Sequence, residues 1–421
     1  MNNIHINNGR NDIQELGAKL FVFILCPFAS FLLSLKNAAS RSSYVIYFLF
    51  AVIFAWNMDT IGFHSYNDLQ GITERIRESH YTTNEIIDQI IAFITFAEDA
   101  PKELYMNFLI WVSKLFSENP HLTFAIAAIP WSYFFLKSLK FITTNPKFRN
   151  SNIICLTILM LFVLPRDVLT LQNPRFTTGV WMAIYACLQL HNSKERRWKY
   201  LILICCTPFI HSGFWPFVLL VPVSLFMKRF EKLTMVFFCA SLPLSYSAYG
   251  IISNIDFTSL FLPDTLSRWI TIYLSKDSYA KFVSNEGGSG FYWIDVLFNT
   301  LIQIVYTIVP FLLWSIKNTL KDIYVKQEIM FYVFLFAVIN TVQFIPVLGE
   351  RYFWIARILT VYIYFKYLYP KYKWWIWACL FACSWYIFQR YFYNGAVSIS
   401  VPKDIFWAPS PYLIWKFLGI V

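Results

Sequence analysis

The sequence predicts an all-α polytopic membrane protein with about 11–13 transmembrane helices, some broken or re-entrant, around an extracytoplasmic cavity. Of its 421 residues, 57% are hydrophobic and only 14% are charged. Several apolar runs of roughly 15–25 residues have the length that a helix needs to cross a bilayer. Because all helices of such a bundle share one lipid solvent, we expect residues 1–421 to form a single integral membrane domain.

The apolar runs predict the helices in order, starting after the polar, Asn-rich residues 1–17. We interpret 18–35 as an uncleaved first span and not as a signal peptide, because Lys36 and Arg41 follow it. The predicted spans are 18–35, 43–58, 121–141, 152–165, 175–190, 200–227, 233–252, 293–316, 327–346, 352–369 and 374–390.

The run 200–227 is interrupted by three prolines and by Gly213. Proline removes a backbone donor and collides with the preceding turn of a helix. We therefore expect either one long kinked helix or two short segments that meet near His211. Two further segments interrupt the pattern of spans. Residues 59–102 are hydrophilic and hold an amphipathic helix in IIDQIIAFITFAEDAP, and residues 253–292 form a second long loop.

The net charge of +11 is better explained by topology than by nucleic acid, because the basic residues occupy short loops between spans. By the positive-inside rule those loops are cytoplasmic, which makes 59–102 and 253–292 extracytoplasmic. The loop 59–102 and the basic cluster at 137–149 then lie on opposite sides, so only one span separates them. Glu103–Phe116 should therefore be a re-entrant or interfacial helix that does not cross.

Ionisable side chains recur where apolar segments break. A charge at a helix centre in a bilayer costs ~2.5–3.5 kcal/mol on insertion scales, so such residues are functional candidates by default. The predicted topology places them on the extracytoplasmic face, where we expect them to form an anion-binding catalytic cavity. They are Asp59, Arg166, Asp167, Arg175, His211, Glu350, Arg351 and Arg357.

Four of these residues are arginines, and guanidinium groups present paired donors that match phosphate oxygens. Arg175 and Arg351, with Arg166 and Arg357, are predicted to bind a phosphate or diphosphate. Each arginine has a plainer interpretation as a headgroup anchor. Arg351 beside Glu350 and Arg166 beside Asp167 can also be simple ion pairs.

Two residues are candidates for the general base. His211 can accept a proton or hydrogen-bond a sugar or phosphate, and the alternative is an interhelical hydrogen bond. Asp59 follows the second span, with Tyr66 nearby to bind saccharide, and the alternative is a helix cap. No histidine pair has zinc spacing and the eight cysteines lie in apolar runs without a C-x-x-C pair, so we expect no metal and no cofactor.

These motifs together resemble the EpsG-like family of bacterial exopolysaccharide polymerases, which is related to the Wzy-type O-antigen and capsule polymerases. The resemblance lies in D-x(6)-Y at Asp59 and Tyr66, E-L-Y at 103–105, Arg175 opening a helix, H-S at 211–212 and R-Y-F at 351–353. Phe176 departs from the polar residue expected after Arg175, and Pro174 precedes that arginine.

The resemblance implies an inner-membrane enzyme that polymerises polyprenyl-diphosphate-linked oligosaccharides on the extracytoplasmic face by metal-independent glycosyl transfer. Attack opposite the leaving diphosphate would invert the anomeric centre. It gives weight to Asp59, Tyr66, Arg175, His211 and Arg351, with Tyr66 binding the substrate. Glu350, which the topology places on the same face, is a further candidate for substrate binding. Other polysaccharide-assembly proteins are expected partners.

Two other functions remain open. A flippase for the same lipid-linked sugar should show two pseudo-symmetric halves, and we find no internal repeat. A membrane acyltransferase that modifies surface glycans should place a histidine near the cytoplasmic face, and His191 is the one candidate in the sequence.

Overall fold

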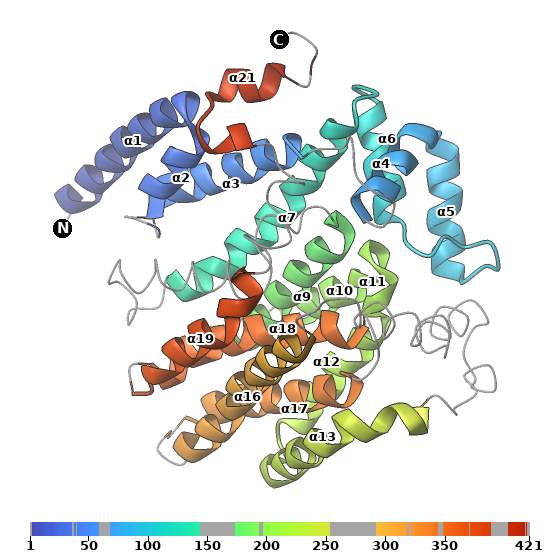
Figure 1. Cartoon of the computed structure of the whole chain (residues 1–421), viewed down its shortest axis with the longest axis vertical. Helices are drawn as coiled ribbons and strands as arrows, with labels where there is room; N and C mark the ends of the chain where they lie inside the picture. The colour runs from blue at the N-terminus through green and yellow to red at the C-terminus, as the bar shows by residue number, and fades with distance from the viewer. Residues whose placement is uncertain are drawn as a thin grey trace. The chain divides into compact units, whose positions relative to one another are not determined.

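The computed structural model is all-α: every regular element in its described residues is helical (Figure 1). The chain forms two compact units, each built from several segments. Unit 1 comprises 1–86, 105–185 and 390–421, and unit 2 comprises 87–104 and 186–389. Whether the whole chain acts as one membrane domain stays a prediction. The described residues are 2–35, 38, 40–58, 68–143, 173–192, 197–252, 292–317, 320, 322–343, 348–369, 371–388, 403–416 and 418.

Unit 1 is organised around the packing of α3 (Arg41–Trp56) against α7 (Pro120–Thr143). Two helices from the start of the chain, α1 (Asn2–Leu25) and α2 (Pro27–Leu35), pack on each other and on α3 (Figure 1). The short elements η8 (Lys403–Phe406) and α21 (Ser410–Trp415) pack against the same three helices. The Ser410 hydroxyl donates to the Phe23 carbonyl, which fastens α21 to α1.

The predicted span at 18–35 is wrong as a single helix. The α1 helix ends at Leu25, Cys26 is non-helical, and α2 begins at Pro27. Proline has no backbone N–H and is tolerated at the first position of a helix, so Pro27 is suited to start α2 and unsuited to continue α1. The chain turns back here, and the Ser30 hydroxyl donates to the Lys19 carbonyl at 2.8 Å.

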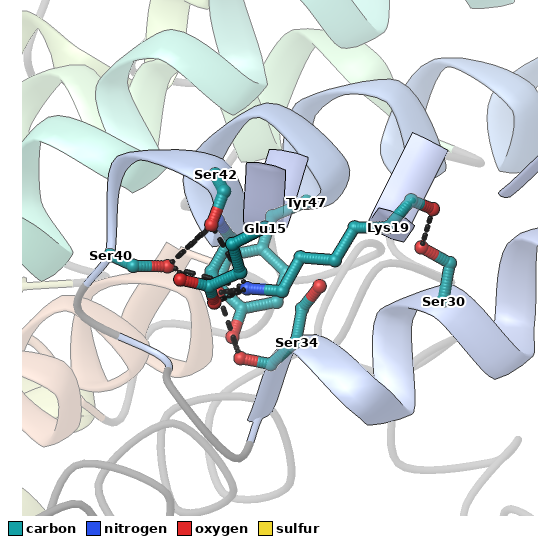
Figure 2. A network of polar contacts seen from close by, with 8 residues as sticks. Glu15, Lys19, Ser30, Ser34, Ser40, Ser42 and Tyr47 are labelled. Atoms are coloured by element: carbon teal, nitrogen blue, oxygen red, sulfur yellow. Dashed lines mark hydrogen bonds and ion pairs between the residues drawn. The ribbon is translucent and has the colours of Figure 1, made fainter. Parts of the chain in front are cut away.

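Lys19 is the centre of a polar network that joins α1, α2 and α3 (Figure 2). The side chain is 7% exposed, and its ammonium donates to Glu15 Oε1 at 2.5 Å. It also donates to the hydroxyls of Ser42 at 3.0 Å and Ser43 at 2.7 Å. Ser43 in turn donates to the Ser34 carbonyl at 2.9 Å. A lysine buried in this way is stable because every proton of its ammonium has an acceptor.

We predict that Lys19→Met lowers the stability of unit 1 by about 1–3 kcal/mol, because the serine hydroxyls lose their shared charged donor. The measurement is the free energy of unfolding of the purified protein in detergent. Lys137→Met is the matched control, since Lys137 is exposed on α7. Equal stabilities of the two variants would show that the network contributes nothing.

The hydrophilic region after the second apolar segment contains α4 (Asp68–Glu78) and the predicted amphipathic helix, α5 (Thr83–Thr95). A capping box starts α5: the Thr82 N–H donates to the Glu85 carboxylate at 2.7 Å, and the Glu85 N–H donates to the Thr82 hydroxyl at 3.3 Å. The Thr82 N–H and the Thr82 hydroxyl, which donates to the same carboxylate at 2.9 Å, lower the pKa of Glu85. One face of α5 buries Ile86 and Phe93. The other exposes an apolar stripe of Ile87, Ile90, Ile91 and Ile94.

The next helix, α6 (Tyr105–Lys114), has 10 residues. Its rise is about 15 Å, half the hydrocarbon thickness of about 30 Å. The α6 helix by itself is therefore too short to span a bilayer. That Glu103–Phe116 is re-entrant or interfacial stays a prediction.

Unit 2 is built around α17 (Ile323–Val342), which is buried along most of its length. The helices α13 (Glu231–Ile252), α12 (Trp215–Met227) and α18 (Leu348–Ile363) pack against it, and α16 (Tyr292–Ile316) packs on α19 (Trp374–Phe388) (Figure 1). The α18 helix continues into η6 (Tyr364–Leu368), a π-helical turn. The α9 helix (Pro174–Asn192) and α5 have residues in both units.

Three helices in the described residues are long and apolar enough to cross a membrane: Pro120–Phe141, Val296–Ile316 and Ile323–Val342. Shorter apolar helices cover Arg41–Trp56, Ser212–Met227 and Trp374–Trp385. These helices support the predicted class, an all-α membrane protein. The predicted span at 152–165 and the loop at 253–291 lie outside the described residues.

Candidate functional site

The candidate site is the break in unit 2 that the prolines of 200–227 predicted. Of the two arrangements left open, the structure has short segments that meet at His211. They are α10 (Arg197–Cys205), α11 (Thr207–Ile210), η3 (Ser212–Phe214) and α12. Pro208 and Pro216 each occupy the first turn of a segment, where a missing N–H leaves no bond unmade.

A backbone hydrogen bond and a cluster of aromatic rings hold this break in place. The Leu104 N–H donates to the Phe209 carbonyl at 3.1 Å, and the rings of Phe93 and Phe209 lie 4.8 Å apart. Phe93 also stacks on Trp215, with 6.0 Å between ring centroids. The cluster therefore fixes both sides of His211, at the end of α11 and at the start of α12.

His211 is extended (φ −155°, ψ 125°), is 4% exposed and caps η3. Its Nδ1 accepts the Gly213 N–H at 3.0 Å. Its Nε2 lies 3.1 Å from Nη1 of Arg351, which stands in the first turn of α18. The structure thus brings together two of the predicted catalytic residues, which are 140 positions apart in the chain.

The two contacts of His211 cannot both be hydrogen bonds to a neutral ring. A neutral imidazole has one N–H and one lone pair, so it accepts at one nitrogen only. Because the backbone N–H of Gly213 cannot turn away whereas a guanidinium can, we take Nδ1 as the acceptor, which leaves the proton on Nε2. The Nε2–H of His211 and the Arg351 guanidinium are then two donors that face each other. An oxygen acceptor that lies beside both nitrogens, such as a phosphate oxygen, can accept from both.

The start of α18 is fastened to the same turn. The Tyr352 hydroxyl donates to the Gly213 carbonyl, so both backbone groups of Gly213 are bonded. Tyr352 is 1% exposed. On its other side α18 approaches the end of α17: a Cβ added to Gly349 would lie 2.3 Å from the Gln343 carbonyl oxygen. No side chain fits at Gly349 without moving the backbone.

We predict that Gly349→Ala displaces the start of α18 and separates Arg351 from His211. The expected result is a lower melting temperature and a weaker protection of the 348–352 amides in hydrogen exchange. Gly71→Ala is the control, because nothing lies within 4 Å of a Cβ added on α4. Exchange rates that match those of the control would contradict the close approach.

Arg357 lies further along α18 among aromatic rings. Its guanidinium carbon is 4.3 Å from the centroid of Phe353, 4.5 Å from that of Trp354 and 5.7 Å from that of Tyr306. Cation–π contacts of this kind stabilise a buried guanidinium. Two of these contacts can be predicted from the sequence, because Phe353 and Trp354 precede Arg357 by four and three residues, which is about one helical turn. Its role in substrate binding stays a prediction.

Arg175 belongs to unit 1, in the first turn of α9, and is partly buried. Asn173 caps this helix: its Oδ1 accepts the Phe176 N–H at 3.3 Å, and its carbonyl accepts the Thr177 hydroxyl. Phe176, the departure from the family pattern, is 3% exposed and packs in the interior. The catalytic role of Arg175 stays a prediction.

Five predicted site residues remain. Asp59, Tyr66, Arg166 and Asp167 lie outside the described residues, and Glu350 is described only as part of α18. Their proposed roles stay predictions. Within the described part of the chain, no three His, Cys, Asp or Glu side chains gather as metal ligands would.

Comparison of the chain with family models, with curated proteins and with solved structures gives no match. Sequence reasoning singled out His211 and Arg351 as site candidates, but it considered Gly213 only as a helix-breaking residue and did not predict its contacts. Its backbone N–H sets the tautomer of His211, and its carbonyl anchors Tyr352. The signal was present as a glycine two positions after a histidine at a proline-rich break.

Proposed function

We propose that this chain is a multi-pass protein of the bacterial inner membrane that polymerises polyprenyl-diphosphate-linked oligosaccharides on the extracytoplasmic face. The proposal rests on the resemblance to EpsG-like and Wzy-type polymerases and on one observation in unit 2. That observation is the convergence of the His211 Nε2 and the Arg351 guanidinium, 3.1 Å apart, at a helix break. Two donors at one point suit an anionic oxygen.

Glycosyl transfer from such a donor breaks the bond between the anomeric carbon and the diphosphate oxygen. Negative charge grows on the diphosphate as the acceptor hydroxyl oxygen bonds to that carbon. Fixed donors in a site of low dielectric stabilise this charge, with an effect often worth ~2.7–4 kcal/mol per donor. Arg351 and the Nε2–H of His211 are assigned to this role.

The hydroxyl proton needs a base. The bond from Gly213 to Nδ1 favours His211 as a donor at Nε2 and not as the base. Asp59 is therefore the remaining base candidate, and attack opposite the diphosphate inverts the anomeric centre.

The test is the fate of lipid-linked repeats in a strain that lacks the protein. A polymerase loss leaves single repeats on the outer leaflet and no long polymer. Repeats retained on the inner leaflet would favour a flippase, and polymer of normal length with altered substituents would favour an acyltransferase. Either of these outcomes would refute the proposal.

A further inference from the structure

A second polar cluster of unit 2 lies at the opposite ends of the helices that carry His211 and Arg351. Lys228 caps the end of α12, and Lys366 lies in η6 at the end of α18. Fifteen residues separate Arg351 from Lys366, which corresponds to about 20 Å of helical rise. The two clusters are therefore distinct, and they are separated by a distance comparable to most of the hydrocarbon core.

The Glu328 carboxylate of α17 already accepts hydrogen bonds from two neighbouring side chains. The Lys366 ammonium is 2.8 Å from each of its oxygens, and the Tyr367 hydroxyl also donates to it. Glu328 is 5% exposed, so this is a buried ion pair. Its hydrogen bonds to a cation go to Lys366, and its negative charge also acts on Lys228.

Two further cations in the cluster have no carboxylate of their own. Lys228 is 6% exposed, and none of the described residues gives its ammonium an acceptor. Arg197, at the start of α10, has a buried Nε with no hydrogen-bond partner among the described residues. Burial, followed by the charges of Arg197 and Arg229, lowers the pKa of Lys228. Cations in a region this poor in solvent are costly unless an anion compensates them.

His191, at the end of α9, lies beside these residues. Its ring is 4.6 Å from Phe331 and 6.2 Å from Tyr332, which are one turn along α17 from Glu328. Its Nε2 is buried and unpartnered in the described residues, as is the Tyr332 hydroxyl. Burial and then the charges of Lys228, Arg197 and Lys366 lower the pKa of His191 to about 3. An imidazole and a phenol without partners among the described residues therefore lie next to each other in this part of unit 2, and three cations act on the imidazole.

We propose that Arg197, Lys228 and Lys366, together with His191, form a binding site for a phosphate monoester, carried on a lipid headgroup or on a soluble molecule. The three cations of this site and the Glu328 carboxylate leave two positive charges, not counting Arg229, which is exposed to solvent. A phosphate monoester carries about −1.5 to −2 charges at neutral pH and offers three acceptor oxygens, which matches this excess. Arginine supplies paired donors and lysine a point charge. A basic pocket between helix ends is also suited to a lipid headgroup. The site does not depend on the proposed function.

The test compares ligand binding by the purified full-length protein and by Arg197→Gln/Lys228→Met. These changes leave Glu328 and Lys366 paired, and they remove buried charge, so folding should be preserved. Lys232→Met, at an exposed lysine near the same end of α13, is the control. The lipid probe is phosphatidic acid in phosphatidylcholine nanodiscs, with phosphatidylglycerol as the diester comparison, and adducts are counted by native mass spectrometry. The soluble probe is glycerol phosphate, measured by calorimetry.

We expect one probe to bind the wild type and the control with equal affinity. We expect its affinity for the double variant to be lower by about tenfold or more. Binding of phosphatidic acid alone identifies a lipid ligand, and binding of glycerol phosphate alone identifies a soluble one. Binding of neither probe overturns the proposal. Equal binding by the double variant, or equal binding of the monoester and diester lipids, does so as well.

Discussion

Arg351→Ala is expected to abolish long polymer while the protein remains folded in the membrane. Arg351 supplies one of the two donors that converge beside His211, at 3.1 Å from its Nε2. Removing one preorganised donor of this kind typically lowers the chemical rate by about 10²–10³-fold. The measurement is the rate of elongation of lipid-linked repeats by purified protein, with folding checked by the melting temperature.

Three further variants sharpen this result. Arg351→Lys keeps the charge but loses the planar pair of donors, so we expect partial activity. In His211→Phe/Arg351→Ala the loss should be smaller than the product of the two single losses, because both groups act on one oxygen. Arg229→Ala, at an exposed arginine of unit 2, is the control. Full activity of Arg351→Ala would remove this residue from the mechanism.

Glu328→Ala is expected to destabilise unit 2 by about 3–5 kcal/mol, because it leaves the Lys366 ammonium partly buried without its counterion. The side chains of Lys366 and Glu328 are 21% and 7% exposed in the ion pair. The double variant Glu328→Ala/Lys366→Met should recover most of the loss, since apolar replacement of both partners of a buried pair is often neutral. Unfolding free energies in nanodiscs of the wild type, of Glu328→Ala, of Lys366→Met and of the double variant give the coupling directly.

A matched comparison separates this effect from a general sensitivity of helix ends. Glu231→Ala breaks the bond to Lys317, 3.0 Å long, in which the Glu231 side chain is 34% exposed. Solvent can compensate there, so we expect a change of about 0–1 kcal/mol. If Glu328→Ala lowers the free energy of unfolding no more than Glu231→Ala does, the buried ion pair of Glu328 contributes no more to stability than the more exposed pair of Glu231.

The apolar runs of the sequence predict the helices well, because continuous hydrophobic length is a local property. The break at His211 was also predictable, since Pro208, Gly213 and Pro216 act on their own turns. The break after Leu25 was missed even though Pro27 marks it. Hydropathy averages over both helices there and does not register a single residue that starts a new one.

Pairings between distant helices were not predictable in the same way. Nothing in the residues around Glu328 indicates that Lys366 is its partner, because that choice depends on how α17 and α18 pack. The contact between His211 and Arg351 was expected only as a shared membrane face. Its atomic form depends on the Gly213 N–H, a backbone group that residue patterns do not reveal.

The π-helical turn at Tyr364–Leu368 closes with a bond from the Tyr369 N–H to the Tyr364 carbonyl, five residues back. Such a turn accommodates one residue more than an α-turn, so every side chain beyond it is rotated by about 100° relative to an uninterrupted α-helix. Deleting one residue here would make this helix end α-helical and turn Tyr367 away from Glu328. The direction in which the side chains at this helix end point is thus set by the one extra residue of the π-helical turn. The number of residues in this turn therefore matters as much as their identity.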